Sequence, residues 1–198
     1  MIELHYPEGA TPIDADELNA LIPSISLQRE LNEFERENIR RAIVWAQKSR
    51  KLRLELLSPE GIRRLHKEMF RDVWRWAGKF RTSEKNVGKV FSYQVPEEVR
   101  KLCDDTTFQI KQGVEDWHRL AVTFHHRLVW IHPFPNGNGR LARLSADLLL
   151  SYNGKSPLSW GYSELASDQE VRAAYLRSLR LADSGEIDPL LKFATKKP

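Results

Sequence analysis

The chain has 198 residues, of which 41% are hydrophobic and 29% charged, the composition of an ordinary globular domain with a full hydrophobic core. Its formal net charge is +4, and basic residues alternate with acidic ones, so a nucleic-acid-binding surface is not indicated. A single cysteine excludes an internal disulfide. No apolar run has membrane-spanning length, and the first residues lack a basic segment followed by an apolar one, so we expect a cytoplasmic protein without membrane contact.

The first long helix is predicted over residues 26–48. Apolar side chains recur there at helical spacing, and Ser26 stands where an N-cap residue is expected. Glu30 lies at the edge of the apolar face, without a basic residue three or four positions after it. From these residues alone, Glu30 is a first-turn glutamate that the helix dipole favours. The apolar residues are Leu27, Leu31, Phe34, Ala42 and Trp45.

A second helix begins at Ser58, which supplies a cap ahead of a first-turn proline, and Gly78 marks its end. Residues 79–95 come next, and they are the one region where strand-type patterns dominate. Short apolar runs flank the sequence Asn-Val-Gly-Lys at 86–89, which favours a β-hairpin. From the residues alone this is a surface hairpin.

Two further helices are expected, one from Pro96 and a long one over residues 114–131. The long helix carries His118, His125 and His126. The adjacent pair invites a metal interpretation, but neighbouring helical residues point about 100° apart and do not share a ligand. No cysteine or carboxylate stands at ligand spacing, so we do not expect zinc.

The most informative stretch is His-Pro-Phe-Pro-Asn-Gly-Asn-Gly-Arg-Leu-Ala-Arg, residues 132–143. Its two prolines end the helix that delivers His132, because proline cannot continue the helical hydrogen-bond ladder. Gly137 and Gly139 permit positive φ and a close approach of the backbone to a ligand. A helix follows from Arg140, so a glycine-containing turn precedes a helix N-terminus, an arrangement that binds anions.

Arg140 and Arg143 are three residues apart on one face of that helix, where both can clamp a polyphosphate with forked donors. His132 immediately precedes the turn, and an imidazole can accept a proton near neutral pH. The stretch therefore predicts a phosphate site with a base beside it. After it we expect helices from Ser167 to about Ala182 and from Asp188, which makes the chain mainly α with one β-hairpin.

The stretch 132–143 resembles the signature of the Fic family, H-P-F-x-[D/E]-G-N-G-R-x-x-R, and it departs from that pattern only at Asn136. The resemblance implies a Fic-type helical bundle with one β-hairpin flap, in a single domain over residues 1–198. In it, residues 26–48 would form an N-terminal inhibitory helix and residues 79–95 the flap. Residues 114–150 would supply the catalytic core helices and the signature loop.

The reaction implied by the resemblance is transfer of AMP from ATP to a Ser, Thr or Tyr hydroxyl of a target protein. His132 would be the base, and the backbone N–H groups of Gly137–Gly139, with the Asn138 side chain, would stabilise charge on the α-phosphate. Arg140 and Arg143 would neutralise the outer phosphates. The flap residues would hold the target segment by strand addition, and these residues are Asn86, Val87, Gly88 and Lys89.

Many Fic proteins carry an inhibitory helix with the pattern [S/T]-x-x-x-E-[G/N], whose glutamate pairs with the second signature arginine. Residues 26–30 fit this pattern up to Glu30, but Leu31 then stands where Gly or Asn is expected. The resemblance therefore implies that Glu30 restrains the enzyme by pairing with Arg143.

Asn136 stands where the family has an acidic residue that holds Mg²⁺ between the phosphates. A neutral carboxamide is a weaker ligand, so we expect any Mg²⁺ to arrive with ATP. This form is similar to the Fic subfamily labelled mobile mystery protein B. Three alternatives to AMP transfer stay open: another nucleotide or phosphate donor, removal of AMP from a target, or a nucleotide-sensing regulator with weak catalysis. The sequence also leaves a homo-oligomer open.

Overall fold

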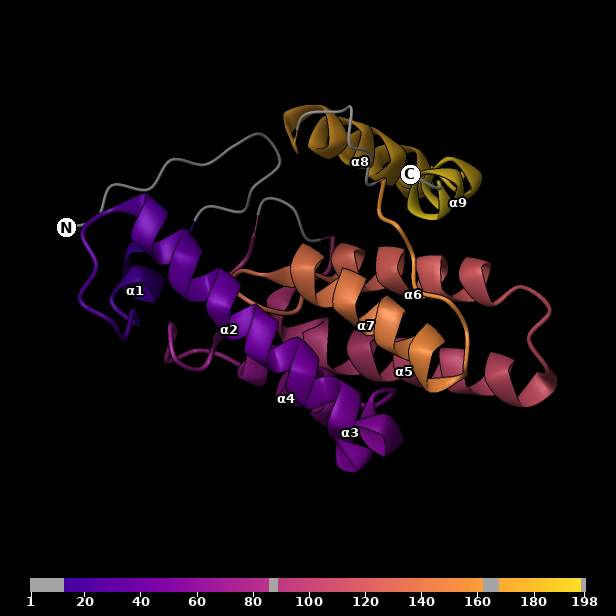
Figure 1. The fold of residues 1–198 in the computed structure, drawn as a ribbon, viewed down its shortest axis with the longest axis horizontal. Coiled ribbons are helices and arrows are strands. Elements are labelled where there is room, and N and C mark those ends of the chain that lie inside the picture. The colour runs from indigo at the N-terminus through magenta and orange to yellow at the C-terminus, as the bar shows by residue number, and fades with distance from the viewer. Residues whose placement is uncertain (1–12, 86–88, 162–167, 197–198) are drawn as a thin grey trace.

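The computed structural model describes residues 13–85, 89–161 and 168–196, most of which lie in helices (Figure 1). In chain order the elements are α1 Ala15–Leu18, α2 Gln28–Lys48, α3 Arg50–Glu55, α4 Pro59–Phe70, the 3-10 turn η1 Ser92–Gln94, α5 Val95–Gln112, α6 Trp117–Ile131, α7 Asn138–Tyr152, α8 Asp168–Asp183 and α9 Asp188–Thr195. The mainly α prediction is confirmed, and α3 is an element that sequence patterns did not indicate.

Local capping chemistry sets several helix ends. Ser58 accepts a hydrogen bond from the Gly61 N–H at 3.0 Å, and proline follows it at the first helical position of α4, as expected. Asp116 caps α6 in the same way through the Arg119 N–H at 2.9 Å. Gly113, with φ of 95°, ends α5 and lets the chain reverse into α6. The chain thereby brings α5 and α6 side by side in opposite directions.

The long helix α6 lies at the centre of the bundle, where it packs against α7 and α5, while α2 packs across α4 (Figure 1). The pair α8–α9 covers α6 on another side, away from α2. Apolar side chains from these helices form one continuous core, with Trp74, Phe70, Phe124 and Phe134 among its largest fully buried members. No helix among the described residues combines the length and the apolar content that a membrane crossing requires.

The predicted β-hairpin at residues 79–95 is the main error of the sequence-based fold. Residues 86–88 lie outside the described part of the chain, and the described residues on either side form no strand. Their hydrogen bonds explain why: the Arg81 N–H donates to the Pro133 carbonyl at 2.9 Å, and the Lys89 N–H donates to the Trp130 carbonyl at 3.1 Å. These backbone N–H groups donate to carbonyls at and just after the end of α6, and not to carbonyls of a facing strand.

Candidate active site

His132 follows directly after α6 and has a left-handed backbone conformation, with φ of 54° and ψ of 61°. Its N–H closes the helix on the Leu128 carbonyl at 3.1 Å. Left-handed geometry is uncommon for a residue with a side chain, and the residue before a proline normally prefers an extended backbone. The conformation turns the chain abruptly out of the helix, and it is a local strain that often marks functional sites.

The His132 side chain is almost fully buried, and its Nδ1 lies 3.3 Å from the Val129 carbonyl oxygen. Because a carbonyl can only accept, Nδ1 carries the proton in this contact and Nε2 is the basic nitrogen. Burial lowers the pKa of His132 to about 4; the Val129 contact opposes this, and the charges of Arg81 and Lys85 add to it. The imidazole is therefore neutral at pH 7, as a proton acceptor must be.

The turn after His132 is held by the side chain of Asn138. Its Oδ1 accepts from the Phe134 N–H at 2.9 Å, and its Nδ2 donates to the Phe134 carbonyl at 2.8 Å. Only 2% of this residue is exposed. The carboxamide therefore braces the turn, and the phosphate contact that we expected of it stays a prediction.

The turn leads into the N-terminus of α7. Gly137 has φ of 79°, and a Cβ there would meet the Phe70 ring at 2.5 Å, so only glycine fits. Gly139 differs from our expectation because it lies inside the first turn of α7 and needs no positive φ. The N–H groups at the start of α7, those of residues 138–140, have no acceptor within the helix, and a helix end of this kind can bind an anion.

Arg140 is held from three sides. Its Nη1 donates to Glu35 Oε2 at 2.7 Å, its Nη2 lies 3.4 Å from Asn136 Oδ1, and its guanidinium stacks over the Phe70 ring at 4.9 Å. The second oxygen of Glu35 accepts from the Trp74 indole N–H at 2.8 Å. A buried carboxylate from α2 therefore balances the charge of the first signature arginine.

Arg143 has a different environment. Its Nε donates to the Gly139 carbonyl at 3.3 Å, and its guanidinium lies over the ring of Tyr175 from α8, 5.5 Å from the centroid. Among the described residues no carboxylate lies within ion-pair distance of Arg143. Arg140 and Arg143 thus lie at one end of α7. The charge of Arg140 is balanced by a carboxylate, whereas within the described part of the chain that of Arg143 is not.

Glu30 does not reach Arg143 in this structure. Its Oε2 accepts from the N–H groups of Ser26 and Leu27, at 3.3 and 3.1 Å, and so caps its own helix. The N-cap residue is Leu27, one position after the expected Ser26. The glutamate of α2 that contacts a signature arginine is Glu35, five residues further on.

Asn136 is poorly suited to hold a metal ion by itself. Its Oδ1 accepts from the Gly137 N–H at 2.6 Å as well as from Arg140. The described residues contain no group of three or more His, Cys, Asp or Glu side chains that could bind a metal. Asn136 therefore brings no charge to a Mg²⁺ ion, which prefers carboxylate, phosphate and water oxygens.

The proposed target-binding residues are only partly described. Asn86, Val87 and Gly88 lie outside the described residues, and Lys89 is exposed beside the end of α6. The segment that leads to them is anchored by Lys85, whose ammonium pairs with Asp14 at 2.7 Å and Glu17 at 2.8 Å. Residues of α1 and of the turn before it thus fix one side of the predicted flap.

The comparisons with known proteins agree with this geometry. Residues 56–150 match the model of the Fic/DOC family. Over these residues the chain is similar to the Fic/DOC family. Within it lie α4, α5, α6 and nearly all of α7, together with the whole stretch 132–143.

Two of the most similar proteins are nematode Fic proteins. The protein adenylyltransferase fic-1 of Caenorhabditis briggsae is 32% identical over 123 residues, which are 61% of this chain and 23% of the relative. A solved structure of Fic-1 from C. elegans, at 26% identity and a TM-score of 0.66, covers 91% of this chain and 52% of that one. The chain spans about a quarter of the length of the curated relatives it matches.

A bacterial structure shows the same fold at lower identity. The BepC protein of Bartonella tribocorum, solved with bound AMPPNP, has a TM-score of 0.68 at 16% identity and covers 93% of this chain and 100% of that one. The Fic-type helical arrangement is therefore confirmed, whereas the mobile mystery protein B subfamily stays a prediction.

Sequence reasoning missed His66, which lies under the turn that follows His132. The Gly78 N–H donates to its Nδ1 at 2.9 Å, so its Nε2 carries the proton and donates to the Asn136 carbonyl at 3.1 Å. The ring stacks on Phe134 at 3.7 Å, and burial lowers its pKa to about 3. One signal was available: His66 stands on an otherwise apolar helix face, with Leu65 and Met69 beside it.

The adjacent histidines of α6, His125 and His126, contact α8. His125 Nε2 lies 3.1 Å from the Tyr175 hydroxyl, and His126 Nε2 lies 2.9 Å from the Asp183 carboxylate. They therefore point to separate partners on α8, as the angle between neighbouring helical residues requires.

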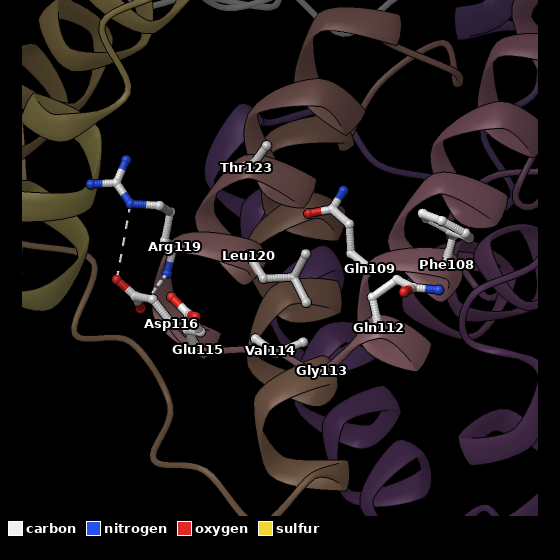
Figure 2. Close-up of a pocket in the computed structure, with 10 residues that line it drawn as sticks. All are labelled: Phe108, Gln109, Gln112, Gly113, Val114, Glu115, Asp116, Arg119, Leu120 and Thr123. Carbon is white, nitrogen blue, oxygen red and sulfur yellow. Dashed lines mark hydrogen bonds and ion pairs between the residues drawn. The ribbon is translucent and has the colours of Figure 1, made fainter.

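A groove of about 470 Å³ lies at the opposite end of α6 from His132, where α5 turns into α6 (Figure 2). Figure 2 shows Phe108 and Leu120 along it, with Arg119 and Asp116 paired at one side. Because the groove adjoins the first half of α6, it is separate from the site at the end of that helix.

Proposed function

We propose that this chain transfers AMP from ATP to a hydroxyl group of a target protein. The observation that carries the proposal is the position of a neutral, buried His132 directly before an anion-binding helix end that bears two arginines. The names of the nematode relatives, protein adenylyltransferases, support the same reaction, as does the AMPPNP bound by the Bartonella protein of similar fold.

In the proposed reaction the hydroxyl oxygen of the target attacks the α-phosphorus, and its proton passes to His132 Nε2. The bond between the α-phosphorus and the bridging oxygen breaks, and pyrophosphate leaves with that electron pair. The N–H groups at the start of α7 stabilise the charge on the transferred phosphate, and Arg140 and Arg143 bind the outer phosphates. The chain itself forms no covalent bond to the nucleotide.

Magnesium enters this proposal as part of the substrate, MgATP, with phosphate and water as its main ligands. Asn136 contributes a neutral oxygen that already accepts two hydrogen bonds. That observation favours a second candidate, in which the domain binds a nucleotide but transfers AMP slowly, or uses another donor, or removes AMP from a target. In either case His132 and the end of α7 form the site.

Two finer features remain proposals. The residues around Asn86–Lys89 align the target segment, because they follow a segment that is hydrogen-bonded to the end of α6 beside His132. Glu30 restrains transfer, a role that the sequence pattern implies and that requires Glu30 to leave its capping position and approach Arg143.

The deciding experiment is incubation of the pure chain with ATP labelled on the α-phosphate, with AMP attachment to protein read by mass spectrometry. We expect labelling by wild type and none by His132→Ala, with similar ATP binding by both. Labelling by His132→Ala at the wild-type level would refute the role of His132. ATP binding without labelling would favour the nucleotide-sensing alternative, and labelling from a different nucleotide would identify another donor.

A further inference from the structure

Arg81 lies between the end of α6 and the segment that leads to the predicted flap, and its side chain has no exposed surface. A guanidinium has five N–H groups, and every one of them finds an acceptor here. Nε donates to the His132 carbonyl at 2.7 Å. The four remaining N–H groups face the Ser83 carbonyl, the Glu84 carboxylate, the Val90 carbonyl and the Ile131 carbonyl.

Three consecutive carbonyl oxygens around the strained turn accept hydrogen bonds from Arg81. The guanidinium binds those of Ile131 and His132, and the Arg81 backbone N–H binds that of Pro133 at 2.9 Å. Carbonyls at the end of a helix have no helical partner and need hydrogen-bond donors such as these. The left-handed conformation of His132 persists only where its surroundings hold it, and these contacts lie on both sides of its Cα.

We propose that Arg81 is a positioning residue for His132: it holds the histidine backbone in the left-handed conformation and thereby fixes the imidazole. Its importance for turnover rests on the proposed function, in which His132 is the base. Lysine cannot replace it, because an ammonium group has three donors and no planar fork for acceptors on two chain segments. The same side chain bonds the carbonyls of Ser83 and Val90, so it also ties the flap segment to the base.

The first test is Arg81→Lys, with Arg63→Lys as its matched control. Arg63 also donates to a backbone carbonyl, that of Gly78 at 2.9 Å, and stacks on Phe80, but it does not contact the His132 turn. For Arg81→Lys we expect kcat of AMP transfer to fall about tenfold to a hundredfold, with KM for ATP nearly unchanged, because misplacing a base affects the reacting step more than binding. Wild-type kcat in Arg81→Lys would overturn the proposal.

The second test does not need catalysis. His132→Gly removes the strain of the left-handed conformation, because glycine adopts it freely. If Arg81 holds that conformation, Arg81→Lys should lower the thermal midpoint of wild type more than it lowers that of His132→Gly. The reason is that neighbouring mutations that share a contact are not additive. Equal shifts in both backgrounds, or failure to fold in both, would overturn the proposal, whereas folding only in combination with His132→Gly supports it.

The two tests separate this inference from the proposed function. If wild type transfers no AMP while the shifts of thermal midpoint are coupled, the proposed reaction fails and the positioning role of Arg81 stands. If transfer depends on His132 but Arg81→Lys matches wild type in kcat, the reaction stands and the positioning role fails.

Discussion

The contact between Glu35 and Arg140 predicts a large loss of stability on Glu35→Gln. Both oxygens of this carboxylate have a partner, the Trp74 indole and the Arg140 guanidinium, and only a tenth of the side chain is exposed. Glutamine offers one acceptor oxygen for these two donors, and its amide N–H groups must face the other donor. The change therefore removes one charge-assisted hydrogen bond and leaves a buried donor without an acceptor.

The expected cost follows from the exposure of the pair. Breaking a fully buried ion pair costs about 3–5 kcal/mol. Because about a third of the Arg140 side chain is exposed and can be hydrated, we expect a lower value, about 2–3 kcal/mol. For a chain of this length that corresponds to a fall in thermal midpoint of about 4–12 °C.

The assay is urea unfolding followed by circular dichroism, with Glu37→Gln as the matched control on the same helix. Glu37 pairs with Arg40, but both side chains are at least half exposed and hydrated, so that change should have little effect on stability. An unfolding free energy of Glu35→Gln within about 0.5 kcal/mol of the control would refute the reasoning. Coupling of Glu35→Gln with Arg140→Gln in a double-mutant cycle would assign the loss to this pair.

Three further predictions concern charge and pH. Asn136→Asp should raise Mg²⁺-dependent AMP transfer by supplying a charged ligand; an unchanged or lower rate across a Mg²⁺ titration would point to another donor or to AMP removal. Glu30→Gly should lower stability by about 1 kcal/mol through the lost cap, and if Glu30 also restrains the site it should raise labelling, an effect absent when His132→Ala is added. Burial lowers the pKa values of His66 and His132 to about 3 and about 4, so the unfolded chain binds more protons below pH 6.5. Urea unfolding should therefore show these two histidines lowering stability by about 3 kcal/mol from pH 6.5 to pH 5, and a flat profile would contradict the neutral buried histidines.

The signature region could be predicted from sequence because its chemistry is local. His132, the turn and the start of α7 are contiguous in the chain, and proline and glycine restrict their backbone strongly. The helices were predictable for the same reason, since capping residues and apolar periodicity lie within each segment. The conformation of residues 79–95 was not predictable, because the acceptors of the Arg81 and Lys89 backbone N–H groups are carbonyls near the end of α6, about forty to fifty residues away in the chain.

The buried face of α2 was not predicted from the sequence, because it contains polar residues. The expected apolar stripe included Leu27 and Phe34, but both are more than 40% exposed. The face that is buried carries Leu31, Glu35, Asn38, Ala42 and Ala46, which also follow helical spacing. Periodicity judged by hydrophobicity alone rejects this face, because two of its five members are polar and their partners lie on α7 and in the residues after α4.

The two signature arginines contact side chains that lie outside the residues matched by the family model. Arg140 is balanced by Glu35 of α2, and Arg143 lies over Tyr175 of α8, whereas the match covers residues 56–150 only. The motif places both arginines at the end of α7, but helices on either side of the domain decide how much positive charge each presents to a phosphate. It follows that α2 and α8 can tune the proposed nucleotide site without any change in residues 132–143.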